Sequence, residues 1–144
     1  MFTRLMESLA ATEALSQVFS DASVLQAMLD FEVALARAEA RCGVIPAQAA
    51  DTIAAVARAE SFDSADCAEL VRLSLRAGTP AIPLVQALQG KVRAKDSASA
   101  GFVHWGATSQ DVVDTALVLL LSNCRALLAA DHDSSRTSAV STTS

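Results

Sequence analysis

The sequence predicts an all-α protein, and three observations support this prediction. Apolar residues recur at helical spacing in five segments, capping residues stand at the ends of those segments, and no alternating run of β-branched or aromatic residues indicates a strand. The 144 residues are 52% hydrophobic and 19% charged. A chain of this length and composition can bury a core of its own.

The first expected helix begins at Ser20 and Asp21 and ends before Gly43, because glycine readily adopts the left-handed backbone of a C-terminal cap. Its apolar residues recur at alternating steps of four and three, which predicts one narrow stripe that packs against a partner helix, within the chain or from another subunit. The stripe consists of Val24, Met28, Phe31, Leu35, Ala38 and Cys42.

Two shorter helices are expected next. Pro46 suits the first position of a helix, where its missing N–H costs nothing, and this second helix is expected to run to about Ala59. Asp63 can cap a third helix, which ends before Gly78.

A fourth helix is expected after Thr79, which serves as its cap. Pro80 and Pro83 fall within its first four residues, whose N–H groups have no partner inside the helix. The helix therefore tolerates both prolines.

The fifth expected helix runs from Ser109 to about Ala129 and is apolar around most of its circumference. Such a helix has to be buried on several sides, and the rest of the chain has too few residues to cover it. We therefore expect partners from the rest of a longer chain or from other subunits. Residues 131–144, rich in Ser and Thr and including His132, are expected to be a disordered tail.

This pattern divides the chain into an N-terminal helical domain over residues 1–107, the start of a helical bundle over 108–130, and the tail over 131–144. A net charge of -5 without a Lys/Arg cluster argues against a nucleic-acid partner. The longest strongly apolar run, 116–121, is too short to span a bilayer, so a cytoplasmic protein with no membrane contact is expected. Three well-separated cysteines indicate reduced thiols rather than disulfides or a metal site.

The polar segment over residues 101–115 precedes and opens the fifth helix. Thr108 and Asp111 have the spacing of a capping box, and the free N–H groups of the first turn, with the hydroxyls of Thr108 and Ser109, can bind a carboxylate or phosphate. His104 can donate to the same anion or transfer a proton, and Gly106 permits a tight turn. Capping alone needs the same residue types, so an ordinary capped helix is the alternative interpretation.

The stretch from His104 to Thr115, HWGATSQDVVDT, resembles the first signature region of the fumarase/aspartase superfamily. It has the His-x-Gly-x-Thr-Ser-x-Asp form shared by adenylosuccinate lyases and 3-carboxy-cis,cis-muconate cycloisomerases. Further segments of the chain resemble the same branch, at 19–21, 28–36, 43–46 and 81–85. The resemblance covers residues 15–129 and implies an all-α N-terminal domain joined to the first long helix of a helical bundle.

Within this branch the chain is more similar to the cycloisomerases of aromatic-acid breakdown, the β-ketoadipate pathway. Adenylosuccinate lyases carry an Arg-His-Asp cluster near the start of the fourth helix, where this chain has Pro80-Ala81-Ile82. The resemblance implies lactonisation of 3-carboxymuconate to 4-carboxymuconolactone, or the reverse elimination, without metal or cofactor. An adenylosuccinate lyase-like enzyme and a non-catalytic helical module that associates with itself or a full-length homologue remain as alternatives.

The resemblance also implies roles for residues. Thr108 and Ser109 would bind a carboxylate of a di- or tricarboxylate substrate, His104 would act as acid or hydrogen-bond donor, and Asp111 and Gly106 would shape the loop. The second signature and the mobile loop with the catalytic Ser are missing from the chain, and family active sites combine three subunits of a homotetramer. We therefore expect no turnover from the chain alone.

Overall fold

The computed structural model describes the backbone of residues 12–141 and side chains as far as residue 133. Within this range every regular element is a helix, which confirms the predicted all-α class. The α-helices are α2 (Glu13–Val18), α3 (Asp21–Arg41), α4 (Ala47–Val56), α5 (Ser64–Ala77), α6 (Ala81–Lys95) and α7 (Ser109–Ser141), with short 3₁₀ helices η1 (Ala59–Ser61) and η2 (Ser99–Phe102). The sequence interpretation did not include α2.

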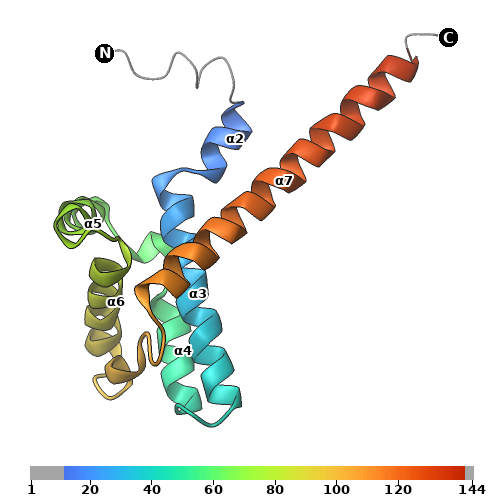
Figure 1. The fold of residues 1–144 in the computed structure, drawn as a ribbon. Helices are drawn as coiled ribbons and strands as arrows, with labels where there is room; N and C mark the ends of the chain where they lie inside the picture. Colours follow the sequence, from blue (N-terminus) through green and yellow to red (C-terminus); the bar gives the residue numbers. More distant parts are fainter. Residues whose placement is uncertain (1–11, 142–144) are drawn as a thin grey trace.

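Helices α2, α4 and α7 pack against α3, while α5 packs against α6 and α6 against α4 and α7. As Figure 1 shows, α3 and α4 run antiparallel, α5 and α6 lie to one side, and α7 crosses α3 before extending beyond the rest of the chain. The buried apolar residues come from α3, α4, α6 and α7 and from the segments between them. Leu29, Ile53, Leu84, Leu88, Val92 and Val112 are among the largest fully buried side chains.

Capping residues set the helix ends largely as predicted. The Ser20 hydroxyl accepts a hydrogen bond from the Ser23 N–H at the start of α3, and Asp63 opens α5 with a capping box. Gly43 and Gly78 follow α3 and α5 with φ of +72° and +71°. These left-handed conformations explain why both helices end at glycine.

Three predicted boundaries of the second and fourth helices differ from the structure. Pro46 and Pro80 each precede their helix as the cap residue instead of being its first residue. The second helix, α4, ends at Val56 and not near Ala59. The Ala59 N–H donates instead to the Gln26 side chain of α3, at 2.8 Å, which holds the chain in the 3₁₀ turn η1.

The predicted stripe of α3 is only in part its core face. Met28 is buried and Val24 and Phe31 pack against the core, whereas Cys42 is exposed. The buried face instead carries Leu25, Leu29, Glu32 and Ala36. A carboxylate at position 32 made this face look polar in sequence, although the side chain is covered completely.

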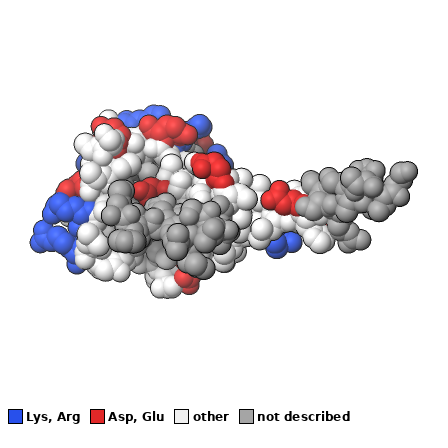
Figure 2. Space-filling model, turned by 90° about the horizontal axis from the view of Figure 1, so that it is seen from above, with Lys and Arg blue, Asp and Glu red and all other residues white. Residues whose placement is uncertain are grey.

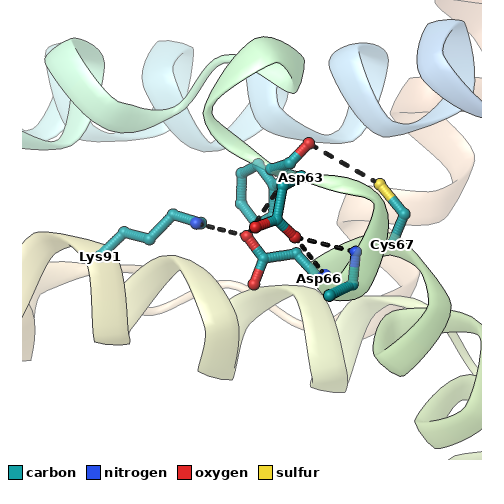
Figure 3. A network of polar contacts seen from close by, with 6 residues as sticks. Asp63, Asp66, Cys67 and Lys91 are labelled. Carbon is teal, nitrogen blue, oxygen red and sulfur yellow. Dashed lines mark hydrogen bonds and ion pairs between the residues drawn. The ribbon is translucent and has the colours of Figure 1, made fainter.

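The α5–α6 pair is held by a polar contact at its edge. Lys91 Nζ lies 2.6 Å from Asp66 Oδ2 and 4.6 Å from the centre of the Phe62 ring. Figure 3 shows this contact beside the Asp63 cap of α5. The hydrogen bond from Lys91, and to a smaller extent its charge, holds the pKa of the Asp66 carboxyl below its usual range.

The long helix α7 is covered only near its start. Val112, Ala116 and Leu120 are buried, whereas Leu117, Val118, Leu119, Leu121 and Leu128 are 39–63% exposed. Figure 2 shows the described part of the projecting helix, where white residues stand beside acidic and basic side chains. The predicted lack of sufficient covering residues within the chain is thus confirmed for the described part of α7.

The predicted end of this helix near Ala129 is wrong, because α7 continues to Ser141. The structure therefore has helix over residues 131–141, where the sequence favoured a disordered tail; residues 142–144 lie outside the described part. No Gly or Pro follows Gly106, so nothing in this stretch breaks the helix. By length and composition alone Ser109–Asp133 is apolar enough to cross a membrane, a weak signal that bundle helices share.

Candidate functional site

The predicted site residues lie on the turn between η2 and α7 and on the first turn of α7. Val103 is buried and anchors the turn against the core. His104 and Gly106 then both have left-handed backbones, with φ of +61° and +70°. His104 is the non-glycine residue with positive φ in the described chain, a conformation that costs free energy and requires support from its surroundings.

That support comes from Glu32 of α3. The Nδ1 atom of His104 lies 2.7 Å from Glu32 Oε1, and the exposed fractions of the two side chains are 16% and 1%. Burial raises the pKa of the Glu32 carboxyl, while the charge of His104 and its hydrogen bonds partly offset this effect. The turn is therefore attached to the centre of the domain by a buried acid–imidazole pair.

A second carboxylate from α3 lies under the same turn. The Glu39 Oε2 atom is buried and forms no hydrogen bond within the described part of the chain, and burial raises the pKa of this carboxyl. A Cβ at Gly106 would lie 4.0 Å from Glu39 Oε1, an ordinary contact distance. Glycine is thus favoured at position 106 by its positive φ and not by lack of space.

Thr108 and Asp111 form the predicted capping box at the start of α7. The Thr108 N–H donates to Asp111 Oδ2 at 2.8 Å, and the Asp111 N–H approaches the Thr108 hydroxyl at 3.4 Å. The hydrogen bonds from the backbone and side chain of Thr108 hold the pKa of Asp111 below its usual range, and the charge of His104 contributes in the same direction. His104 and Asp111 therefore lie within electrostatic reach of each other.

The hydrogen bonds of Thr108 affect its predicted substrate-binding role. Its hydroxyl donates to Asp111 Oδ2 at 2.8 Å, so it has to rotate before it can donate to a ligand. Ser109 is the first residue of α7 and is partly exposed. Its hydroxyl and the free N–H groups of the first turn are the donors ready to bind an anion.

The structure thus brings together His104, Gly106, Thr108, Ser109 and Asp111, and adds two carboxylates that sequence reasoning missed. Glu32 and Glu39 are a helical seven-residue step apart, a signal that points to one face of α3 but not to burial. In the described part of the chain no three His, Cys, Asp or Glu side chains gather in an arrangement for a metal ion.

Trp105 belongs to this turn, whereas other features of the described surface lie away from it. Trp105 is 52% exposed, with its ring centre 6.1 Å from that of Phe102. An apolar pocket of about 650 Å³ between α3, α5 and the start of α6 contains none of the predicted site residues. His132 is exposed on α7.

Residues 6–134, nearly the whole chain, match the protein family described as lyase. The chain belongs to this lyase family, and its helical fold is that of the fumarase/aspartase-type lyases, as the signature predicted.

Individual relatives show which branch of the family this chain resembles. The chain is 48% identical over 132 residues to the 3-carboxy-cis,cis-muconate cycloisomerase of Bradyrhizobium diazoefficiens, which covers 92% of this chain and 28% of that protein. It is 54% identical over 114 residues to the Pseudomonas aeruginosa protein of the same name, covering 79% and 24%. The solved structure of the Pseudomonas putida 3-carboxy-cis,cis-muconate lactonizing enzyme superposes with a TM-score of 0.82 at 42% identity, covering 88% and 28%. The predicted likeness to this branch is confirmed, and the chain spans 24–28% of the length of these proteins.

Proposed function

We propose that this chain is the N-terminal portion of a cycloisomerase that closes 3-carboxy-cis,cis-muconate to its lactone. In this proposal it supplies a carboxylate-binding corner of an active site and has no turnover alone. The observation that carries the proposal is the turn over residues 103–111, whose sequence matches the superfamily signature and whose free donors converge at the start of α7. The names of the relatives supply the reaction.

The reaction needs a site that binds carboxylates and controls one proton. In the lactonisation a carboxylate oxygen forms a C–O bond to one alkene carbon, and a proton is added to the neighbouring carbon beside another carboxylate. The intermediate places extra negative charge on that carboxylate, so fixed hydrogen-bond donors stabilise it. The product contains every atom of the substrate.

Residues of this chain would contribute binding and charge stabilisation. The N-terminal N–H groups of α7 and the Ser109 hydroxyl would bind one substrate carboxylate, and the Thr108 hydroxyl would join them after leaving Asp111. His104 would donate a hydrogen bond or proton from its ring edge opposite Glu32. Asp111 and Gly106 would hold the turn in shape.

Assembly and cellular context complete the proposal. The uncovered apolar face of α7 fits a helical bundle built with the rest of the protein and with further copies, a homotetramer in the intact family. The substrate is a small tricarboxylate, the reaction uses no cofactor, and neither nucleic acid nor membrane takes part. A cytoplasmic location agrees with a soluble substrate of aromatic-acid breakdown.

Calorimetric titration of 3-carboxy-cis,cis-muconate into the purified chain tests this proposal. We expect binding that Ser109→Ala and Thr108→Ala weaken and Thr108→Ser largely retains, because serine keeps a hydroxyl at the cap. Ser20→Ala is the matched control, since it removes a cap from α3 at a distance from the turn. Lactone formation should be undetectable with the chain alone.

Two results would contradict the proposal. Absence of binding by a chain whose circular dichroism is helical would show that the turn is not a carboxylate site. Enzyme-dependent lactone formation that His104→Ala abolishes would show that the chain is complete for catalysis.

A non-catalytic interaction module is the second candidate, and the exposed apolar face of α7 favours it. A defined complex with a full-length homologue, without any binding of the tricarboxylate, would support this candidate over the first. An adenylosuccinate lyase-like enzyme would instead bind a purine nucleotide.

A further inference from the structure

Glu32 is an unusual residue to find at the centre of this domain. Its side chain is 1% exposed and lies on the α3 face that also buries Leu25, Leu29 and Ala36. Among the described buried side chains it is the charged one; the other polar members are Thr52 and Ser99. A buried carboxylate costs free energy unless a partner satisfies it, and the partner here is His104.

The contact fixes His104 in two respects. The Nδ1 atom is held 2.7 Å from Glu32 Oε1, which determines the orientation of the ring. The backbone of His104 is in the left-handed region with φ of +61°, so the same contact also holds a strained residue of the turn. Glu32 therefore supports both the ring and the turn that leads to α7.

Counting protons shows what this contact does to the other ring nitrogen. If the pair as a whole is neutral, its shared proton lies either on Nδ1 of an imidazolium or on the Glu32 carboxyl, and Nε2 carries a hydrogen in both arrangements. When the pair carries a net negative charge, Nδ1 keeps the single ring hydrogen for the Glu32 carboxylate and Nε2 loses its hydrogen. Burial disfavours that state, so the pair keeps Nε2 as a hydrogen-bond donor.

The Nε2 atom of His104 is available to donate a hydrogen bond to a ligand. Within the described chain Nε2 forms no hydrogen bond, the His104 side chain is 16% exposed, and the ring lies within electrostatic reach of Asp111 at the first turn of α7. A donor at this place is next to the backbone N–H groups and hydroxyls that are available to an anion.

We infer that Glu32 is a positioning residue that holds His104 by Nδ1 and keeps a hydrogen on Nε2, so that His104 donates to the substrate carboxylate bound at the start of α7. Glu32 does not touch the substrate and acts through His104. This inference rests on the proposed carboxylate-binding function and extends it by one residue.

Nitrogen-15 NMR of the imidazole rings tests the inference without any ligand. The chain has two histidines, and His132→Ala assigns the signals of His104. We expect a hydrogen on Nε2 of His104 near about pH 7.5, where an unperturbed histidine is mostly neutral. Glu32→Gln offers an uncharged carbonyl to the Nδ1 hydrogen, so we expect Nε2 to lose its hydrogen in this variant.

Titration of 3-carboxy-cis,cis-muconate supplies the second readout. Glu32→Gln should weaken binding roughly tenfold, the usual effect of losing one charge-assisted hydrogen bond, and should add little in the His104→Gln background. Asp30→Asn is the matched control, because it removes a carboxylate from the exposed face of the same helix. A purely structural role for Glu32 would lower stability without changing which ring nitrogen carries the hydrogen.

Three outcomes overturn the inference. They are a wild-type His104 without a hydrogen on Nε2, a Glu32→Gln variant whose Nε2 is unchanged, and affinity losses from Glu32→Gln and His104→Gln that add. If Glu32→Gln does not fold, the wild-type spectrum still decides the inference. If the wild-type chain does not bind the tricarboxylate, the proposed function fails while the NMR readout still tests the effect of Glu32 on His104.

Discussion

The exposed stripe of α7 leads to a prediction about self-association that can be worked out in magnitude. Leu117, Leu121, Cys124 and Leu128 follow one another at steps of four, three and four, so they share one side of the helix. The three leucines are 49%, 50% and 51% exposed. We expect this stripe to associate with another copy of α7.

The free energy gained on association can be estimated from the solvent-exposed area of these leucines. Full burial of a leucine is worth about 1.5–3 kcal/mol, so burying the exposed half gives about 1 kcal/mol for each leucine. Two helices with three such leucines each would gain about 6 kcal/mol in a symmetric pair. This estimate omits the cost of association, so it sets the scale of the loss and not the affinity itself.

The perturbation is the double variant Leu121→Glu, Leu128→Glu. It removes four of the six leucines from a symmetric pair, a loss of about 4 kcal/mol, and therefore raises the dissociation constant about a thousandfold before charge repulsion is added. Light scattering coupled to size exclusion, over a range of protein concentrations, measures the mass. We expect the wild-type chain to associate and the variant to be monomeric.

The control is a second exposed apolar pair on another helix. Val71 and Leu75 of α5 are 59% and 83% exposed, and Val71→Glu, Leu75→Glu changes charge and hydrophobicity by a similar amount. This control should keep the wild-type mass. Equal dissociation of both double variants, or an unchanged mass of the α7 variant, would refute the assignment of the interface to α7.

Three further predictions concern stability and are measured by urea unfolding. Leu29→Ala should cost about 2–5 kcal/mol because this side chain is 0% exposed, whereas Leu75→Ala should change little. The pKa of Glu39 in the folded chain is raised above 4.5, so the contribution of this carboxyl to folding stability is present below pH 4.5 and is lost as the pH rises through the folded pKa. We therefore expect Glu39→Gln to stabilise the chain by up to about 1 kcal/mol at pH 7 and to have no such effect near pH 4. Because the pKa of Asp66 is lowered in the folded chain, its carboxylate contributes folding stability above pH 3.8, and this contribution is lost as the pH falls through the folded pKa. Asp66→Asn should lower the stability by only about 0.5 kcal/mol at pH 7, because the contact of Asp66 with Lys91 is partly exposed. An equal effect of Glu39→Gln at both pH values, or a larger loss for Leu75→Ala than for Leu29→Ala, would contradict this reasoning.

The fold could be predicted where local chemistry determines it. Gly43, Gly78 and Asp63 set helix ends through backbone freedom and capping, which depend on a few neighbouring residues. The end of α4 could not be predicted, because it depends on the Gln26 side chain of another helix. The length of α7 was underestimated because Ser and Thr lower helix propensity without breaking a helix.

The sequence predicted only those parts of the candidate site that lie close together along the chain. Thr108 and Asp111 are neighbours in sequence, and their capping box follows from their spacing. Glu32 is 72 positions from His104, and a single charged residue in a helix is normally read as exposed. The sequence therefore indicated a donor set at the start of α7 but not the carboxylate that orients one of its members.

The covered and uncovered parts of α7 together support the proposal that this chain binds a carboxylate without catalysing a reaction. Val112 and Ala116 fix the first turns of α7 against the domain, and Glu32 fixes His104, so the donors of the turn are positioned by this chain alone. Beyond Leu120 the described part of the helix has no buried residue. A carboxylate bound at the turn would thus have donors on one side and solvent on the other, whereas stabilising a transition state requires a site closed to water. The helices that cover the stripe of α7 would then also supply the missing wall, which ties assembly and catalysis to the same surface.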